Sequence, residues 1–276
     1  MAIYEKIIEV NNYVTKSNLP DSDYVINPYI GCIHGCKYCY ACFMKRFTNH
    51  KEEWGTFIDI KKSSSPIPTK KLKNKKIFMS SVTDCYNPLE EKHLITRKIL
   101  NELINIDCYL TISTKSSLIL RDIDLIKQMK NVKVALSINT LDEKFRADMD
   151  QASNIKERLD ALKILHDNGI YTVLFMSPIF PKITDFKEIV RCSNSFVNEY
   201  WFENLNLRGS YKHDIMNYIK QEYSQYYALY EEIYIKKNNS FWENLSNEIE
   251  DYCMRLNLNY INYFYHEKLV KKNKQK

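Results

Sequence analysis

Two kinds of apolar segment alternate along most of this chain of 276 residues. Short runs rich in β-branched and aromatic residues are each followed by a longer stretch with helical spacing of its apolar residues. The expected strands are 25–29, 76–82, 109–114, 132–139, 171–179 and 201–207. The expected helices are 41–49, 94–104, 123–129, 154–167 and 185–198. Six such units predict an α/β fold with a parallel sheet and right-handed crossovers.

The alternation stops after about residue 211. Helical spacing then predicts one long helix over 216–236 and another over 241–256, followed by an extended segment over 257–265. We therefore expect three parts: an N-terminal extension (1–23), an α/β core (24–211) and a helical C-terminal cap with a basic tail (212–276).

Three cysteines, Cys32, Cys36 and Cys39, form a tight C-x-x-x-C-x-x-C run after the first expected strand. Three thiolates in such a loop can hold three irons of a [4Fe–4S] cluster and leave the fourth iron open to another ligand. Cys42 extends the run, so a four-thiolate electron carrier is an alternative. No further C-x-x-C or H-x-x-H pair follows downstream, which argues against a structural zinc site.

This cysteine run, with Tyr38 directly before the third cysteine, resembles the motif of radical S-adenosylmethionine (SAM) enzymes. Other segments resemble the spore photoproduct lyase-like (DNA repair photolyase-like) group, and most of all its small members called radical SAM mobile pair protein B. The segments that carry the resemblance are 27–32, 38–40, 44–47, 54–57, 82–84, 114–116, 136–139 and 178–181. The resemblance covers about residues 18–207. It implies a partial (β/α)6 TIM barrel, a cluster on the three cysteines, and SAM on the open iron.

Polar residues follow several of the expected strands, where parallel barrels place their reactive groups. Asp84 follows the second strand and Lys115 the third, and their opposite charges suit the ammonium and carboxylate of SAM. The residues expected to bind the cofactor are Tyr38, Ser81, Asp84, Lys115 and Ser137. Cys85 and Tyr86 come directly after Asp84, and they are the candidates for a catalytic step on the substrate.

The charge pattern does not identify a substrate. The net charge is +6, and part of the excess lies in two lysine-rich runs at 70–76 and 268–276. Such runs are more often solvated loops than nucleic-acid grooves, so we expect them to be loops.

The resemblance implies an enzyme that forms a 5′-deoxyadenosyl radical, with a nucleic-acid lesion or modified base as the first candidate substrate. A peptide or protein, modified together with a sister radical SAM protein, is the alternative. A non-catalytic, metal-containing nucleic-acid-binding protein is the rival from another class. The radical chemistry also needs a reductant such as flavodoxin or ferredoxin.

Composition also bears on the compartment. The chain has eight cysteines, and no apolar signal segment precedes the first domain. Free thiols and an oxygen-sensitive cluster suit a reducing compartment, so we expect a cytoplasmic protein. No uninterrupted apolar stretch is long enough to span a bilayer, and we expect no membrane partner.

Overall fold

A large, mostly parallel sheet organises the computed structural model, which describes residues 3–209 and 211–264. Its order is β11-β10-β9-β8-β7-β6-β3-β2, and every neighbouring pair is parallel except β2 with β3. The strands are β2 (Val14–Lys16), β3 (Tyr24–Ile26), β6 (Lys76–Met79), β7 (Tyr109–Thr114), β8 (Val132–Ser137), β9 (Tyr171–Ile179), β10 (Glu199–Asn204) and β11 (Tyr260–Asn262). The expected α/β fold with a parallel sheet is confirmed.

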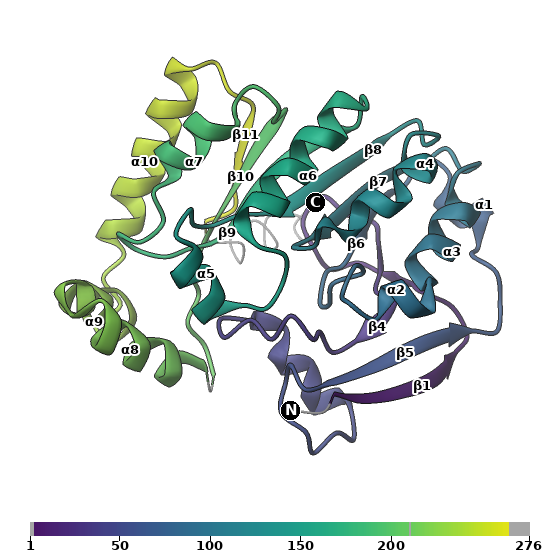
Figure 1. Cartoon of the computed structure of the whole chain (residues 1–276), viewed down its shortest axis with the longest axis horizontal. Coiled ribbons are helices and arrows are strands. Elements are labelled where there is room, and N and C mark those ends of the chain that lie inside the picture. Colours follow the sequence, from purple (N-terminus) through teal and green to yellow (C-terminus); the bar gives the residue numbers. More distant parts are fainter. Residues whose placement is uncertain (1–2, 210, 265–276) are drawn as a thin grey trace, which may run out of the picture.

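Helices cover one face of this sheet (Figure 1). They are α3 (Ile95–Leu103), α4 (Ile123–Ile126), α6 (Ile155–Asp167) and α7 (Phe186–Ser193). Alternate residues of each strand face them, so that Leu110 and Ile112 of β7 are buried while Thr111 between them is only half-buried. The main hydrophobic core fills the space between the sheet and these helices.

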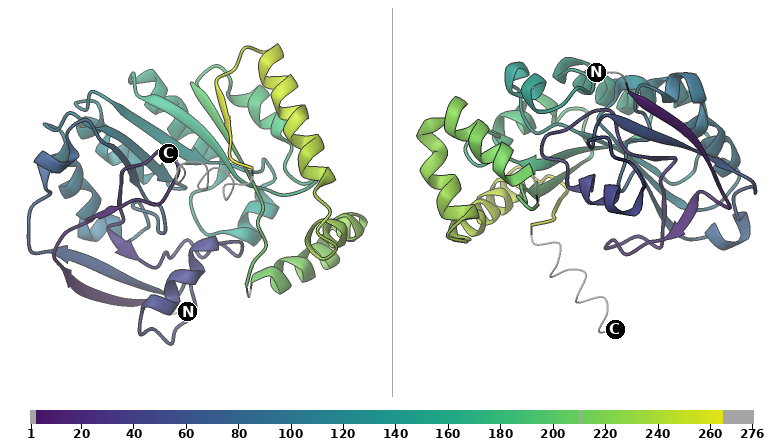
Figure 2. Two further views of the ribbon diagram at one scale, coloured as in Figure 1. Left: turned by 180° about the vertical axis from the view of Figure 1, so that it is seen from behind. Right: turned by 90° about the horizontal axis from the view of Figure 1, so that it is seen from below.

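The sheet is open rather than closed into a barrel. Strands β2 and β11 are its two edges, and no pairing between them occurs among the described residues. Figure 2 shows the sheet from behind, on the side opposite to these helices. This open parallel sheet agrees with the partial barrel expected from the sequence.

The C-terminal part departs from the expected single helix over 216–236. The chain forms α8 (Tyr211–Glu222), a 3-10 turn η3 (Ser224–Tyr226) and α9 (Tyr227–Tyr234). The backbone leaves the helical conformation at Tyr223, whose ring packs edge-on against Phe145. Tertiary packing of this tyrosine thus interrupts a segment whose spacing alone predicts one helix.

After α10 (Ser240–Arg255) the chain returns to the large sheet. The expected extended segment over 257–265 contains β11, which pairs in parallel with β10. The cap therefore contributes a strand as well as helices. The basic tail at 268–276 lies outside the described residues.

A second, three-stranded sheet lies beside the first, and the sequence analysis did not predict it. It contains β1 (Tyr4–Val10), β5 (Phe57–Ser63) and β4 (Tyr29–Ile30) in the order β1-β5-β4. In the same region, the helix expected over 41–49 is a 3-10 helix, η1 (Tyr40–Phe47). Strand β1 was missed because its side chains are mostly exposed, which leaves little contrast between its two faces.

The remaining helices are short: α1 (Thr69–Leu72), η2 (Ser117–Asp122), α2 (Glu90–His93) and α5 (Glu143–Met149). The lysines between residues 70 and 76 are exposed, as expected for a solvated segment. None of the helices in the described ranges combines the length and hydrophobicity that crossing a membrane requires.

A buried ion pair fixes the cysteine loop to the core. Arg158 of α6 donates to Asp150 at 2.5 Å, and both side chains are 1% exposed. The same guanidinium donates to the carbonyl of Ser137 at the end of β8 (3.1 Å), and Tyr38 donates to Asp150 (3.1 Å). This ion pair thus joins a helix, a strand end and the loop between Cys36 and Cys39.

We predict that Asp150→Ala destabilises the fold by about 3–5 kcal/mol, because it leaves the Arg158 guanidinium buried without its partner. Urea denaturation followed by circular dichroism measures this change. The matched control is Asp160→Ala, which removes an exposed partner of Lys156 and should cost at most about 1 kcal/mol. Equal losses of stability in the two variants would contradict this role for Asp150.

Candidate active site

A cavity of about 570 Å³ lies against the face of the large sheet that the helices leave free. The cysteine loop lies at one end of it, together with residues that follow the carboxyl ends of β6, β7 and β8. The other end reaches the beginnings of the same strands, at Lys76, Tyr109 and Val132. The volume is in the range of small-molecule and cofactor sites.

Cys32, Cys36 and Cys39 all line this cavity, whereas Cys42 is not among the residues that line it. The loop is closed by short-range hydrogen bonds, such as that from the Cys39 N–H to the Cys36 carbonyl (3.1 Å). Gly31 enters the loop with φ +87°, and a Cβ there would lie 2.4 Å from the Phe57 carbonyl oxygen. A glycine is therefore required directly before the first cysteine.

The three thiols suit a metal cluster better than free cysteine chemistry. Burial raises the pKa of Cys32, Cys36 and Cys39, and the charges of neighbouring thiolates add to the rise at Cys32. Iron offsets this cost, because a metal ion holds a coordinating thiol in its deprotonated form. Among the described residues, no three His, Cys, Asp or Glu side chains are grouped to bind one metal ion. A metal cluster bound to the three thiolates would therefore offset the cost of burying their charges.

Lys115 supplies a cation beside the thiols. It follows β7 and lines the cavity, and its Nζ lies 5.7 Å from the centre of the Tyr38 ring. Its charge lowers the pKa of Cys36 against the larger effect of burial. The expected place of Lys115, next to the cluster and able to meet a carboxylate, agrees with this geometry.

Asp84 lines the cavity, but its carboxylate is already bonded within the protein. It accepts hydrogen bonds from the Thr114 hydroxyl (2.7 Å) and the Lys115 N–H (2.8 Å), and His34 lies 3.2 Å away. Burial would raise its pKa, yet these partners hold it down at about 2. We therefore assign Asp84 to positioning Lys115 and His34, and not to the SAM ammonium group as the sequence suggested.

The other expected SAM contacts divide into two groups. Ser81 and Ser137 line the cavity and are largely buried. Tyr38 is not among the lining residues, because its hydroxyl donates to Asp150 and its ring packs on Phe180. Its side chain supports the loop, and the structure does not bring it to the SAM position.

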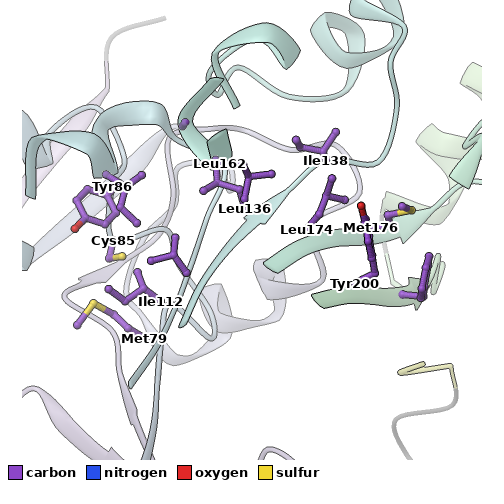
Figure 3. Packing of buried hydrophobic residues seen from close by; sticks show 14 of the residues in the cluster. Met79, Cys85, Tyr86, Ile112, Leu136, Ile138, Leu162, Leu174, Met176 and Tyr200 are labelled. Atoms are coloured by element: carbon purple, nitrogen blue, oxygen red, sulfur yellow. The ribbon is translucent and has the colours of Figure 1, made fainter. Parts of the chain in front are cut away.

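Cys85 and Tyr86 lie away from the cavity. Both side chains are fully buried in the main core, beside Met79 and Ile112 (Figure 3). The chain turns after Asp84 and directs them between the sheet and the helices. The candidate catalytic role for Cys85 and Tyr86 is not supported by this placement, and we do not retain it.

Several lining residues were missed by the sequence analysis. His34 lies inside the cysteine loop, and Tyr40, directly after it, donates to the Ser81 carbonyl. Glu203 of β10 was also missed; it lines the cavity and accepts a hydrogen bond from the hydroxyl of Ser177 on β9. Glu203 comes near the end of the last core strand, so the rule that located Asp84 and Lys115 would have found it.

An aromatic wall covers the middle of the cavity. Phe175, Trp201 and Tyr263 pack edge-on around one another, with ring centres 5.5 Å apart for Phe175–Trp201 and 5.6 Å for Trp201–Tyr263. They belong to a second, smaller apolar cluster that is separate from the main core. The cavity therefore combines a polar, cysteine-lined end with an aromatic surface.

Comparison with known proteins identifies the family. The model of the radical SAM superfamily matches residues 26–192, which is more than half of the chain. The chain belongs to the radical SAM superfamily. Membership implies SAM and an iron–sulfur cluster as cofactors of this radical SAM enzyme, and the cysteine loop offers the thiolates that such a cluster requires.

Relatives of this radical SAM enzyme occur in cellular organisms and in a virus. An uncharacterized protein of Methanocaldococcus jannaschii is 39% identical over 80% of this chain and 85% of its own. An uncharacterized protein of the Acidianus two-tailed virus is 32% identical over 64% of this chain and 62% of its own. Neither name gives a substrate.

Solved structures agree on the fold of this radical SAM chain. Spore photoproduct lyase with bound SAM (AdoMet) and a dinucleoside spore photoproduct has a TM-score of 0.58 at 14% identity, over 79% of this chain and 66% of that chain. SuiB from Streptococcus suis bound to SAM also has a TM-score of 0.58, at 15% identity, over 86% and 49%. The chain thus spans slightly less than two thirds of the lyase and about half of SuiB.

We predict different effects for the two charged residues beside the radical SAM cysteine loop. Lys115→Ala should weaken SAM binding by about 1.5–3 kcal/mol, the range for a charge-assisted hydrogen bond, with little loss of fold stability. Asp84→Ala should instead lower the free energy of unfolding, because it leaves the Thr114 hydroxyl and the Lys115 N–H without their acceptor.

Calorimetry of SAM binding and urea denaturation of both variants separate the two roles. Lys115→Met, which keeps much of the side-chain volume, is the matched control for packing. Unchanged SAM affinity in Lys115→Ala, or an unchanged free energy of unfolding in Asp84→Ala, would contradict the corresponding assignment.

Proposed function

We propose that this radical SAM enzyme holds a [4Fe–4S] cluster through Cys32, Cys36 and Cys39 and cleaves SAM reductively. The observation that carries the proposal is the selective exposure of these three thiols to the cavity, which excludes Cys42 from the lining. Three thiolates leave one iron of a four-iron cluster without a protein ligand. That arrangement favours a cofactor-binding cluster over the four-thiolate electron carrier.

When bound, the cluster supplies one electron, which cleaves SAM into methionine and a 5′-deoxyadenosyl radical. The chain's own part is to bind and orient SAM. Lys115 would pair with the SAM carboxylate, while Ser81 and Ser137 offer hydroxyls in the same part of the cavity. Ser177 and Glu203 offer further polar groups for the ribose or the ammonium group.

For the substrate we propose a base in a nucleic acid, either a lesion or a modified base. The aromatic wall of Phe175, Trp201 and Tyr263 suits a planar ring, because aromatic side chains are common partners of unpaired bases. Lys130 lies at the far end of the cavity and would attract a phosphate group, whereas the nearby Lys133 is already paired with Glu199. A similar fold in a lyase that binds a dinucleoside photoproduct is compatible with this choice.

A peptide or protein substrate is the second candidate. SuiB bound to its precursor peptide SuiA matches this chain with a TM-score of 0.55 at 14% identity. An enzyme of this kind would act with a sister radical SAM protein or on a protein partner. Strand β11 is an edge of the large sheet in the described part of the chain, and an extended peptide would pair with such an edge.

The cluster assignment predicts that Cys32→Ala, Cys36→Ala and Cys39→Ala each abolish cluster retention. Cys42→Ala is the matched control and should keep the cluster, because its thiol does not face the cavity. Iron and sulfide contents with electron paramagnetic resonance spectra after anaerobic reconstitution measure this. Chromatography for 5′-deoxyadenosine after dithionite reduction then tests SAM cleavage. A Cys42→Ala protein without its cluster would refute the three-thiolate assignment.

The substrate proposal predicts that a single-stranded oligonucleotide binds the loaded enzyme and that Phe175→Leu weakens this binding by about 1–3 kcal/mol. The leucine keeps an apolar contact and removes the aromatic face. Fluorescence titrations at two salt concentrations provide the affinities. As the control, Tyr227→Leu alters an aromatic side chain on α9, outside the cavity lining, and should bind normally. Stimulation of SAM cleavage by peptides but not by nucleic acids would favour the second candidate.

A further inference from the structure

The 3-10 helix η1 (Tyr40–Phe47) follows the cysteine loop without a linker, because Cys39 is its N-cap residue. Only Ala41 of its eight residues is buried. Phe43 and Phe47 are 41% and 66% exposed, and their rings contact each other at 6.5 Å. The helix lies near the N marker in Figure 1, at the outside of the molecule.

Positive charge surrounds these two phenylalanines. The Arg46 guanidinium lies over both rings, 5.3 Å from the centre of Phe43 and 4.7 Å from that of Phe47. Lys37 and Lys51 are exposed on the segments on either side. Exposed aromatic residues with an arginine between them are typical of the centre of a protein interface. We call Phe43, Arg46 and Phe47 the η1 patch.

The η1 patch follows the cysteine loop but is not part of the cavity lining. Phe43, Arg46 and Phe47 are absent from the cavity lining, while Tyr40 at the start of the same helix belongs to it. A partner on the patch would therefore approach the cluster ligand Cys39 without entering the space for SAM and substrate. A reductant needs such a position, because electron transfer weakens steeply with distance and must not compete with substrate binding.

We propose that the η1 patch is the docking surface for an acidic one-electron carrier protein of the flavodoxin or ferredoxin kind. Arg46 and the flanking lysines attract a negatively charged partner, and the two phenylalanines supply a small apolar contact. A small surface is sufficient, since electron-transfer encounters bury less than about 1,200 Å². This inference rests on the proposed cluster, which is the acceptor of the electron.

A nucleic acid is the other class of partner that a basic, aromatic surface attracts. The geometry favours a protein, because the Arg46 guanidinium lies over both rings and occupies the place where a base would stack on them.

The reaction at this surface is a single electron transfer. Flavodoxin in its anionic hydroquinone form gives one electron to the oxidised cluster and becomes the neutral semiquinone, so no proton is transferred. The cluster gains one unit of negative charge. No SAM is consumed in this step, so cluster reduction can be measured on its own.

The test compares two variants of the patch, Phe47→Ser and Arg46→Glu, in the cluster-loaded chain. Stopped-flow absorbance follows cluster reduction by flavodoxin hydroquinone without SAM, and dithionite is the second reductant. We expect the rate with flavodoxin to fall at least about tenfold in both variants and to fall with added salt in the unmodified chain. Reduction by dithionite should stay unchanged.

Matched controls repeat the changes elsewhere on the surface. Met254→Ser alters a 60% exposed apolar side chain on α10, and Lys98→Glu reverses an exposed charge on α3. Both should react with flavodoxin like the unmodified chain. Equal rates in patch and control variants, or an unmodified chain that flavodoxin does not reduce, would overturn the docking proposal. Loss of oligonucleotide binding in the patch variants with normal flavodoxin rates would instead assign the patch to nucleic acid.

The same experiment distinguishes a failure of the docking proposal from a failure of the proposed function. A chain that retains no cluster refutes the cluster assignment before any carrier is added. A loaded chain that dithionite reduces, but whose patch variants react normally with flavodoxin, refutes only the docking surface.

Discussion

The contact on which the rest of the site depends is the buried pair of Arg158 and Asp150. A charge taken out of water is costly unless its partner and further hydrogen bonds satisfy it, and here every bond reaches a different element. The guanidinium bonds the carbonyl of Ser137, and the carboxylate accepts the hydroxyl of Tyr38. Backbone bonds reinforce the connection, from Lys37 N–H to the Met149 carbonyl and from Gln151 N–H to the His34 carbonyl. The cysteine loop is thereby fixed at the end of the parallel strands, where its thiols face the cavity.

A second set of hydrogen bonds, around Asp84, fixes the positions of charged residues at the same end of the sheet. Asp84 accepts bonds from Thr114 and Lys115 at the end of the neighbouring strand β7 and lies beside His34, so it sets the position of the Lys115 backbone. The Lys115 ammonium then remains available beside the thiols. From the sequence, Asp84 and Lys115 were both expected to bind SAM. In the structure, Asp84 bonds within the protein, whereas Lys115 faces the cavity. Spacing along the sequence cannot distinguish these tasks, because it does not reveal which carboxylate already has internal donors.

Much of the fold could be predicted, because residue periodicity and helix capping are properties of short sequence segments. The strand at 109–114 alternates buried and more exposed residues, the strand at 171–179 is mostly buried, and the helix Ile155–Asp167 begins with a capping box at Asn154 and Glu157, so these elements were predicted closely. The exposed strand Tyr4–Val10 has no such contrast between its faces and was missed. The three cysteines proposed as cluster ligands were located by their spacing and by the resemblance to radical SAM enzymes, and all three line the cavity. Cys85 and Tyr86 could not be placed, since one turn of the chain after Asp84 decides whether they face the cavity or the core.

The aromatic wall gives the sheet an apolar surface that the covering helices do not reach. In most domains such a surface lies against another layer of the same chain. Here the cavity lies against this surface, so a ligand bound in it would add to the packing of the second apolar cluster. Ligands that bind only the folded chain stabilise it by mass action. SAM binding would consequently raise the free energy of unfolding of this enzyme. Its stability in a cell would then depend on the concentration of SAM.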